Sequence, residues 1–141
     1  MDQPKRTKWR KQMKQVRHLR GTETRGCELS FGDYGLQVQE AGWITARQIE
    51  AMRVSVSRYV KRGGKLWVKI FPQKPFTKKA AETRQGSGKG NTEYWVAEVR
   101  PGRILIEITG VTEQIANEAF KRGGSKLSLS TKFVKRSDYL L

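Results

Sequence analysis

The clearest pattern of hydrophobic and polar positions lies between residues 45 and 64. Apolar residues recur there at spacings of three and four, as on one face of a helix: Ile49, Met52, Val56 and Val60. Thr45 followed by Gln48 is the start of a capping box, and Gly63 and Gly64 mark the expected end. The remaining faces carry Arg47, Arg53, Arg58, Lys61 and Arg62. The pattern predicts a helix that buries one side and presents cations on the other.

Alternating apolar positions predict several strands. Apolar pairs at 29 and 31 and at 36 and 38 flank Gly-Asp-Tyr-Gly, which predicts a strand, a turn and a strand over residues 28–39. Residues 65–71 alternate in the same way and form a strand that Pro72 and Pro75 are expected to end. Residues 94–99 and 104–108 are two further strands, joined by a turn in which Pro101 and Gly102 fit a type II geometry.

A second helix and a last strand complete the expected fold. Thr112 caps the helix, and its inward residues are expected to be Ile115, Ala116, Ala119 and Phe120. Residues 126–134 predict the strand. Lys-Arg-Gly-Gly occurs at 61–64 and again at 121–124, each time after an expected helix, which similar helix ends explain as well as duplication does. We therefore predict an α+β fold: one compact domain with a mixed or antiparallel sheet and two helices.

Two stretches lack a core pattern and set the domain organisation. Residues 1–25, here called the arm, interleave lysine and arginine with a single aromatic residue, Trp9. We expect a basic RNA-binding arm that orders on RNA, with a helix on acidic lipid or a solvated tail as alternatives. The α+β domain is expected over residues 26–136 and a tail over 137–141.

The second stretch, here called the finger, spans residues 76–91. From Lys78 onward its cations face one acid, Glu82, and its only apolar side chains are two alanines. Glycines at positions 86, 88 and 90 favour a flexible loop that approaches a ligand closely. We expect a long insertion between strands of one sheet, with fixed roots and a free tip. A mobile solvated loop is the alternative.

The charge distribution favours a ligand for both stretches. The formal net charge is +16, of which residues 1–25 contribute +7 and residues 53–90 contribute +10. Two separate cationic runs of this size favour a surface that binds phosphates. Arms and fingers fit the irregular grooves of structured RNA better than regular duplex DNA. Tyr94 and Trp95 beside the finger are candidates for stacking on a base, although strand alternation predicts that at least one of them is core.

Several other classes of protein do not fit the sequence. Cys27 and His18 are single residues of their kind, so we expect no disulfide, metal site, cofactor or catalytic triad, and a reducing compartment. A P-loop needs glycine and Ser or Thr where Thr83 and Gly90 stand, and Asn91 replaces the third glycine of a dinucleotide loop. The first residues lack a signal peptide's apolar core, and we expect neither secretion nor a membrane span. We predict that the chain is not an enzyme, with an RNA-modifying enzyme as the alternative.

Several blocks in order along the chain resemble one family. They are Pro4-Lys5-Arg6-Thr7-Lys8, Phe31-Gly32 to Gly35-Leu36, Ile44 to Ala51, Lys65 to Pro72, and Gly86 to Asn91 with Glu93 to Ala97. They are similar to the bacterial-type large-subunit ribosomal protein sixteen family. The resemblance spans residues 1 to about 136 and implies a compact α+β domain. It departs from the family pattern at Asp2, at Gln85 and at Gly123-Gly124, which leaves the end of the second helix open.

The resemblance implies a structural constituent of the large ribosomal subunit that helps to organise the aminoacyl-tRNA site and joins the particle late in assembly. The implied rRNA-binding residues are Lys5, Arg6, Lys8, Arg10, Lys11, Arg47, Arg53, Arg58, Lys61 and Arg62. The implied contacts with tRNA and the peptidyl-transferase region are Lys78, Lys79, Arg84, Gln85, Ser87 and Lys89. Expected partners are large-subunit rRNA, A-site tRNA with P-site tRNA second, and neighbouring ribosomal proteins, with no homo-oligomer. The expected compartment is the bacterial cytoplasm, with an organellar bacterial-type ribosome as the alternative.

Overall fold

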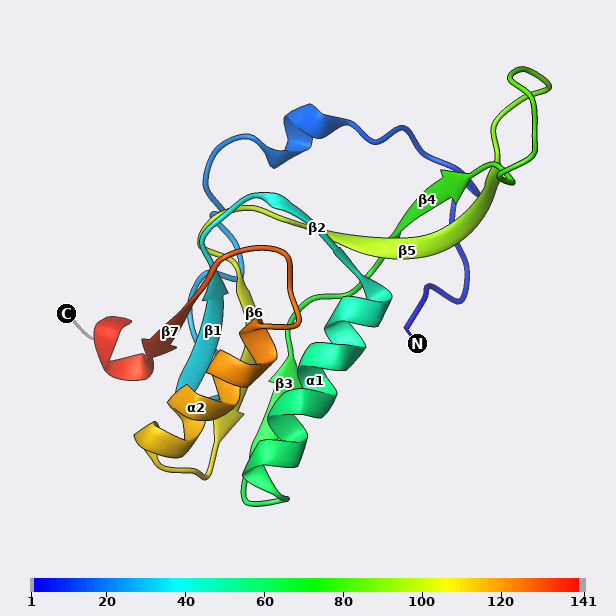
Figure 1. The fold of residues 1–141 in the computed structure, drawn as a ribbon. Coiled ribbons are helices and arrows are strands. Elements are labelled where there is room, and N and C mark those ends of the chain that lie inside the picture. The colour runs from blue at the N-terminus through cyan, green and yellow to red at the C-terminus, as the bar shows by residue number, and fades with distance from the viewer. Residues whose placement is uncertain (1, 140–141) are drawn as a thin grey trace.

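Two antiparallel sheets and two helices make up the fold of the computed structural model, which describes residues 2–139 (Figure 1). The larger sheet has the strand order β3 (Lys65–Val68), β6 (Ile104–Thr109), β1 (Tyr34–Val38) and β7 (Thr131–Lys135). The smaller sheet has the order β2 (Gly42–Thr45), β5 (Asn91–Val99) and β4 (Lys74–Lys78). Helices α1 (Ala46–Val60) and α2 (Glu113–Gly124) lie side by side over the larger sheet. The predicted α+β class is confirmed, with two antiparallel sheets in place of one.

Helix α1 has the predicted start and buried face. The Thr45 hydroxyl accepts the backbone N–H of Gln48, and the Gln48 side chain accepts that of Thr45, which completes the capping box. The four predicted core residues of α1 are buried. The predicted end is wrong in detail, because Lys61 and Arg62, with φ of 52° and 68°, make the left-handed reversal instead of the glycine pair. Position 64 has no room for a side chain, because a Cβ there would lie 2.4 Å from the Thr109 carbonyl oxygen.

Helix α2 is longer than predicted and packs very closely on α1. It is capped by Thr112 and continues through Gly124, so the second Lys-Arg-Gly-Gly lies inside the helix and does not follow it. A Cβ at Gly123 would lie 2.6 Å from Cγ2 of Val56 on α1, which explains the glycine in this otherwise helical stretch. Ile115 was expected inside but is 40% exposed, because it faces the gap between the two helices.

Several predicted strand bounds are wrong. Residues 28–31 form no strand, because backbone hydrogen bonds to the side chain of Glu107 replace strand pairing there. Strand β1 of the larger sheet begins only at Tyr34. Strand β3 ends at Val68, and β7 begins only at Thr131. Strands β2 and β4 were not predicted. Pro75 lies within β4, which is tolerated because β4 is an edge strand of its sheet.

The turn between β5 and β6 is confirmed. The N–H of Arg103 donates to the Arg100 carbonyl at 3.2 Å, and Gly102 has the positive φ, 102°, that a type II turn requires.

The core lies between the helices and the larger sheet and continues under β2 and β5. Its fully buried members include Met52, Val56, Leu105, Ile106, Ile108, Ala116 and Phe120. A second small cluster of Leu29, Ile104 and Val134 is covered by residues 26–32. Neither helix in the described part of the chain has the length and apolar character needed to cross a bilayer.

Short 3₁₀ helices lie near both ends of the chain, at Val16–Leu19 (η1) in the arm and at Arg136–Tyr139 (η2). The first residue of the predicted arm and the last two residues of the predicted tail lie outside the described residues.

Candidate nucleic-acid interface

The arm lies along the smaller sheet and is attached to the root of the finger (Figure 1). The Lys11 ammonium donates to the Lys89 carbonyl at 2.9 Å, and the Lys89 ammonium donates to the Gln12 carbonyl at 2.6 Å. The Thr92 hydroxyl on β5 donates to the Arg10 carbonyl at 3.1 Å. These three bonds, each to a backbone carbonyl, join the arm to the finger root. The two segments therefore form one unit that presents cationic side chains.

A second anchor holds the far end of the arm. The backbone N–H of Glu23 donates to the Pro101 carbonyl at 2.9 Å, and its carboxylate accepts Nη2 of Arg100 at 3.0 Å. Burial acts to raise the pKa of Glu23, but hydrogen bonds from the Arg25 and Thr24 N–H groups and from Arg100 outweigh it and hold that pKa below its ordinary value. The carboxylate therefore fixes the arm to the β5–β6 turn in its charged form.

The finger connects β4 to β5, and its loop runs from residue 79 to residue 90. The predicted range 76–91 is wider because it also includes the end of β4 and the start of β5. Every residue from 78 to 89 is exposed, and the loop extends well beyond the body (Figure 1). The Lys79 ammonium donates to the Gly86 carbonyl at 2.7 Å, which closes the loop on itself. Arg84, Gln85 and Ser87 lie at the exposed tip.

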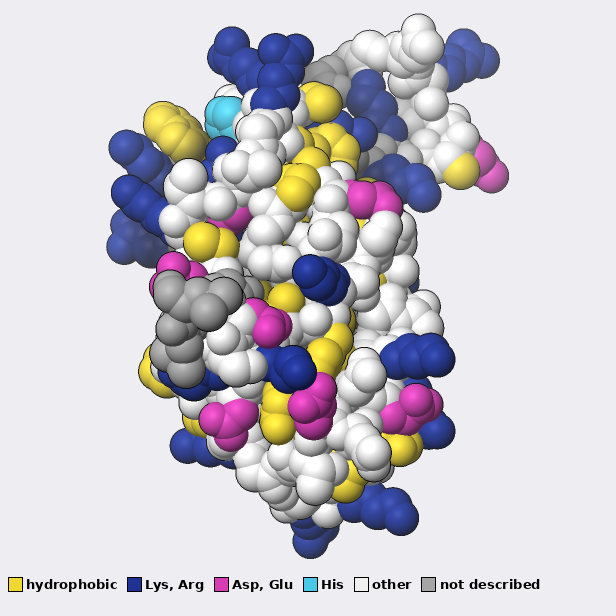
Figure 2. All heavy atoms as spheres, turned by 90° about the vertical axis from the view of Figure 1, so that its left-hand side faces the viewer, with side chains coloured by type: hydrophobic (Ala, Val, Ile, Leu, Met, Phe, Trp, Pro, Cys, Tyr) yellow, Lys and Arg dark blue, Asp and Glu magenta, His cyan; other side chains and the backbone are white. Residues whose placement is uncertain are grey.

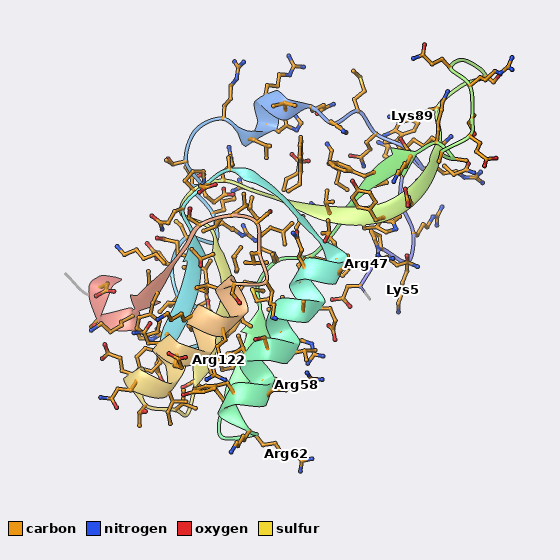
Figure 3. All side chains as sticks on the ribbon, viewed as in Figure 1. Lys5, Arg47, Arg58, Arg62, Lys89 and Arg122 are labelled. Atoms are coloured by element: carbon orange, nitrogen blue, oxygen red, sulfur yellow. The ribbon has the colours of Figure 1, made fainter. Side chains whose placement is uncertain are left out.

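The predicted cations of α1 fall into different environments. Arg47 lies at the helix start, beside the beginning of the arm, and Arg62 extends from the opposite end (Figure 3). Arg53 is engaged by Glu50, with Nη2 at 2.6 Å from Oε1. The hydrogen bond of this pair lowers the pKa of Glu50 and raises that of Arg53. Arg53 is therefore partly neutralised, whereas Arg47, Arg58 and Lys61 line a groove.

That groove, here called the interhelical groove, lies between α1 and α2 and has a volume of about 1510 Å³. Its apolar lining includes Val54, Val111 and Ile115. Its rim carries five cationic residues, Arg47, Arg58, Lys61, Arg122 and Lys126. The Arg122 guanidinium lies 4.3 Å from the centre of the Tyr59 ring across the groove (Figure 3).

The sequence did not lead us to predict Arg122 and Lys126 as candidate binding residues. The available signal was the repeated Lys-Arg-Gly-Gly, because Lys61 and Arg122 from its two copies meet at this groove. The structure thus joins cations from both helix ends on one surface.

The charged side chains are not evenly spread over the molecule. Lysine and arginine dominate the end that carries the arm and finger, whereas aspartate and glutamate lie among them lower on the body (Figure 2). Among residues 2–139, no group of three or more His, Cys, Asp and Glu side chains is arranged to hold a metal ion. The surface is suited to binding a polyanion through phosphate contacts.

The model of the family described as ribosomal protein L16p/L10e matches residues 4–134, which include the arm from residue 4 onward, the finger and both helices. The chain belongs to this family. It is a structural protein of the large ribosomal subunit, in a cytoplasmic or organellar ribosome, and its partners are rRNA and other ribosomal proteins. The family is structural and not known as an enzyme, which favours the predicted non-enzymatic role over RNA modification.

Proposed function

We propose that the protein binds large-subunit rRNA through the arm, α1 and the interhelical groove, and that its finger contacts tRNA in the A site, with P-site tRNA as a second contact. The finger carries this proposal: all its residues from 78 to 89 are exposed, it extends beyond the body, and its root is joined to the cationic arm. A loop that contributes nothing to the core but is fixed at its base is suited to reach a separate ligand.

The arm and α1 supply the proposed rRNA contacts. Lys5, Arg6, Lys8, Arg10 and Lys11 are exposed, and the carbonyl bonds at Arg10 and Gln12 hold their backbone in an extended path. On α1 we assign Arg47, Arg58, Lys61 and Arg62 to phosphates, with Arg122 and Lys126 added from α2. Arg53 and Arg122 keep smaller roles because Glu50 and Glu118 already pair with them.

The finger residues divide into scaffold and contact residues. Lys79 and Lys89 donate to backbone carbonyls and maintain the shape of the loop and its junction with the arm. Lys78 stands at the root, at the end of β4. Arg84, Gln85 and Ser87 remain for the ligand, and Arg84 offers the planar fork that binds phosphate in two places. We therefore assign the principal tRNA contact to Arg84.

Organisation of the A site and late entry into the subunit are further parts of this proposal. The arm and the finger would then order against rRNA and tRNA that come together only when the subunit is nearly complete. We also propose the division into an arm at 1–25, a domain at 26–136 and a tail at 137–141. The proposed compartment is the bacterial cytoplasm, with an organelle as the alternative.

The test uses large subunits that carry single variants of the protein. Arg84→Ala should lower the affinity for A-site tRNA several-fold, on the order expected for one lost phosphate contact, without loss of the protein from subunits sedimented at high salt. Arg84→Lys keeps the charge and should retain part of the affinity. Lys132→Ala removes one exposed charge on β7 and is the matched control.

Unchanged A-site tRNA affinity in Arg84→Ala subunits would refute the role of the finger. Release of the unmodified protein from subunits at high salt would instead refute an integral rRNA contact, since weakly held proteins lose phosphate contacts steeply with salt.

A further inference from the structure

An aromatic pair, an exposed Phe31 and a half-buried Trp67, lies at the β3 edge of the larger sheet. The rings of Phe31 and Trp67 are stacked with centroids 5.7 Å apart and an interplanar angle of 24°. The Lys69 ammonium lies 4.2 Å from the Phe31 centroid, and the Lys65 ammonium lies 5.3 Å from the Trp67 centroid. Phe31 remains 58% exposed, so the pair leaves apolar surface open between two cations.

The backbone around Phe31 is held by a buried carboxyl group. Glu107 is completely buried, and its oxygens accept the N–H groups of Ser30, Phe31 and Gly32 at 3.0, 2.7 and 2.8 Å. From the other side, the Arg136 guanidinium donates to the Gly32 carbonyl at 2.7 and 3.2 Å.

Gly32 allows this close approach. A Cβ at that position would lie 2.7 Å from the Ile108 carbonyl oxygen. The exposed ring of Phe31 is therefore presented on a rigid loop and not on a mobile one.

The strand beneath the pair is fixed as well. Trp67 is paired with Glu107 in the β3–β6 ladder, which places both on the same face of the sheet. Just beyond β3, the Lys69 N–H donates to the Leu105 carbonyl at 2.9 Å, and Arg103 Nη2 donates to the Lys69 carbonyl at 3.2 Å. Two cations, Lys65 and Lys69, thus lie over the rings of a fixed strand and loop.

We propose that Phe31 and Trp67 form a stacking platform for an unpaired base of large-subunit rRNA, with Lys65 and Lys69 neutralising the flanking phosphates. This inference rests on the proposed rRNA binding and adds a site of a different kind, because it recognises a base through its π face. Aromatic rings beside cations are the usual means of binding single-stranded nucleic acid. On binding, the flexible lysine side chains move from the rings to phosphates, and the base takes the open face of Phe31.

Charge decides between RNA and a protein as the occupant. An apolar side chain of a neighbouring protein would need the area around the rings to be uncharged or apolar, as the centres of protein interfaces are. Here Lys65 and Lys69 lie over the rings, and the carboxyl group of Glu107 accepts three backbone hydrogen bonds and is completely buried.

The experiment compares two replacements of Phe31 that separate stacking from apolar packing. Large subunits assembled without this protein are titrated with the unmodified protein, Phe31→Leu and Phe31→Tyr, and unpaired rRNA bases are probed chemically in each complex. Phe31→Leu should weaken binding roughly tenfold, the loss of one base–aromatic stack, whereas Phe31→Tyr should bind within about twofold of the unmodified protein. Bases protected by the unmodified protein and by Phe31→Tyr should become reactive with Phe31→Leu.

Equal binding of Phe31→Leu and the unmodified protein would overturn the proposal and leave the result for Arg84 untouched. Weaker binding of Phe31→Leu without any change in base reactivity would identify a protein side chain as the occupant and also overturn it. Failure of the unmodified protein to bind subunits assembled without it would refute rRNA binding itself. The double variant Lys65→Ala, Lys69→Ala should lower the salt dependence of binding, since each lost phosphate contact reduces that slope by about one.

Discussion

The buried carboxyl group of Glu107 offers the sharpest test of how the larger sheet is stabilised. Its two oxygens accept three consecutive backbone N–H groups at 2.7 to 3.0 Å, from residues 30–32, a segment that forms no strand. We expect Glu107→Ala to detach this segment from β6 and to destabilise the whole domain.

The size of the effect follows from the burial of each donor. The N–H of Gly32 is buried, and an unsatisfied buried donor costs about 1–3 kcal/mol. The bonds to Ser30 and Phe31 are part-buried, and each contributes about 0.5–1.5 kcal/mol because water replaces it. The sum is about 2–6 kcal/mol of the free energy of unfolding, or a fall in Tm of roughly 6–24 °C for a chain of this size.

Glu107→Gln provides a graded comparison. Its carbonyl oxygen retains the two bonds to Phe31 and Gly32, but its NH₂ group meets the N–H of Ser30, where two donors oppose each other. We expect a loss of about 1–2 kcal/mol. Glu93→Ala, at an exposed position of β5, is the matched control and should change stability by less than about 0.5 kcal/mol.

The assay combines urea unfolding followed by circular dichroism with amide hydrogen exchange of residues 30–32. A loss below about 1 kcal/mol in Glu107→Ala would contradict the calculation, because it would fall below the sum of the three lost hydrogen bonds. Global destabilisation with unchanged protection of these three amides would also refute the reasoning, since the effect would then arise elsewhere.

Three further predictions concern other contacts. Gly123→Leu should lower the free energy of unfolding by about 2 kcal/mol or more, because its Cβ meets α1 at 2.6 Å, while Lys121→Leu on the exposed side should stay within about 0.5 kcal/mol in the same thermal assay. Lys89→Met removes one of the three bonds that join the arm to the finger root, so the arm should loosen and chymotrypsin should cleave after Trp9 faster; an unchanged rate would exclude a contribution of that bond. Because the folded pKa of Glu23 is lowered, its stabilisation is complete above the unfolded pKa and is lost as pH falls through the folded one. The protection factor of its amide, measured against intrinsic exchange at each pH, should therefore fall as the pH drops below about 4.5.

The accuracy of the sequence analysis differed between helices and strands. The start and buried face of α1 were predicted correctly, since a capping box and a period of 3.6 are local properties of the chain. The strand predicted over 28–31 was wrong because the backbone donors there bind Glu107, which is 75 to 77 residues away in sequence. Strand β4 was missed because Pro75 argues against a strand unless the strand is known to lie at an edge.

The candidate interface shows the same division. The cationic arm, the glycine-rich finger and the family blocks are visible in the sequence because composition and charge do not depend on folding. The bonds between Lys11 and Lys89, and the meeting of Arg122 with Tyr59 over the groove, join residues that are distant along the chain.

The sequence by itself determined the α+β class, the helix that carries cations, the two basic segments and the family. Only the tertiary structure decided which cations are free, which are paired, and where an aromatic pair lies open between lysines. The physical reason is that propensity and charge are carried by each residue, whereas burial, ion pairing and stacking exist only between residues that folding brings together.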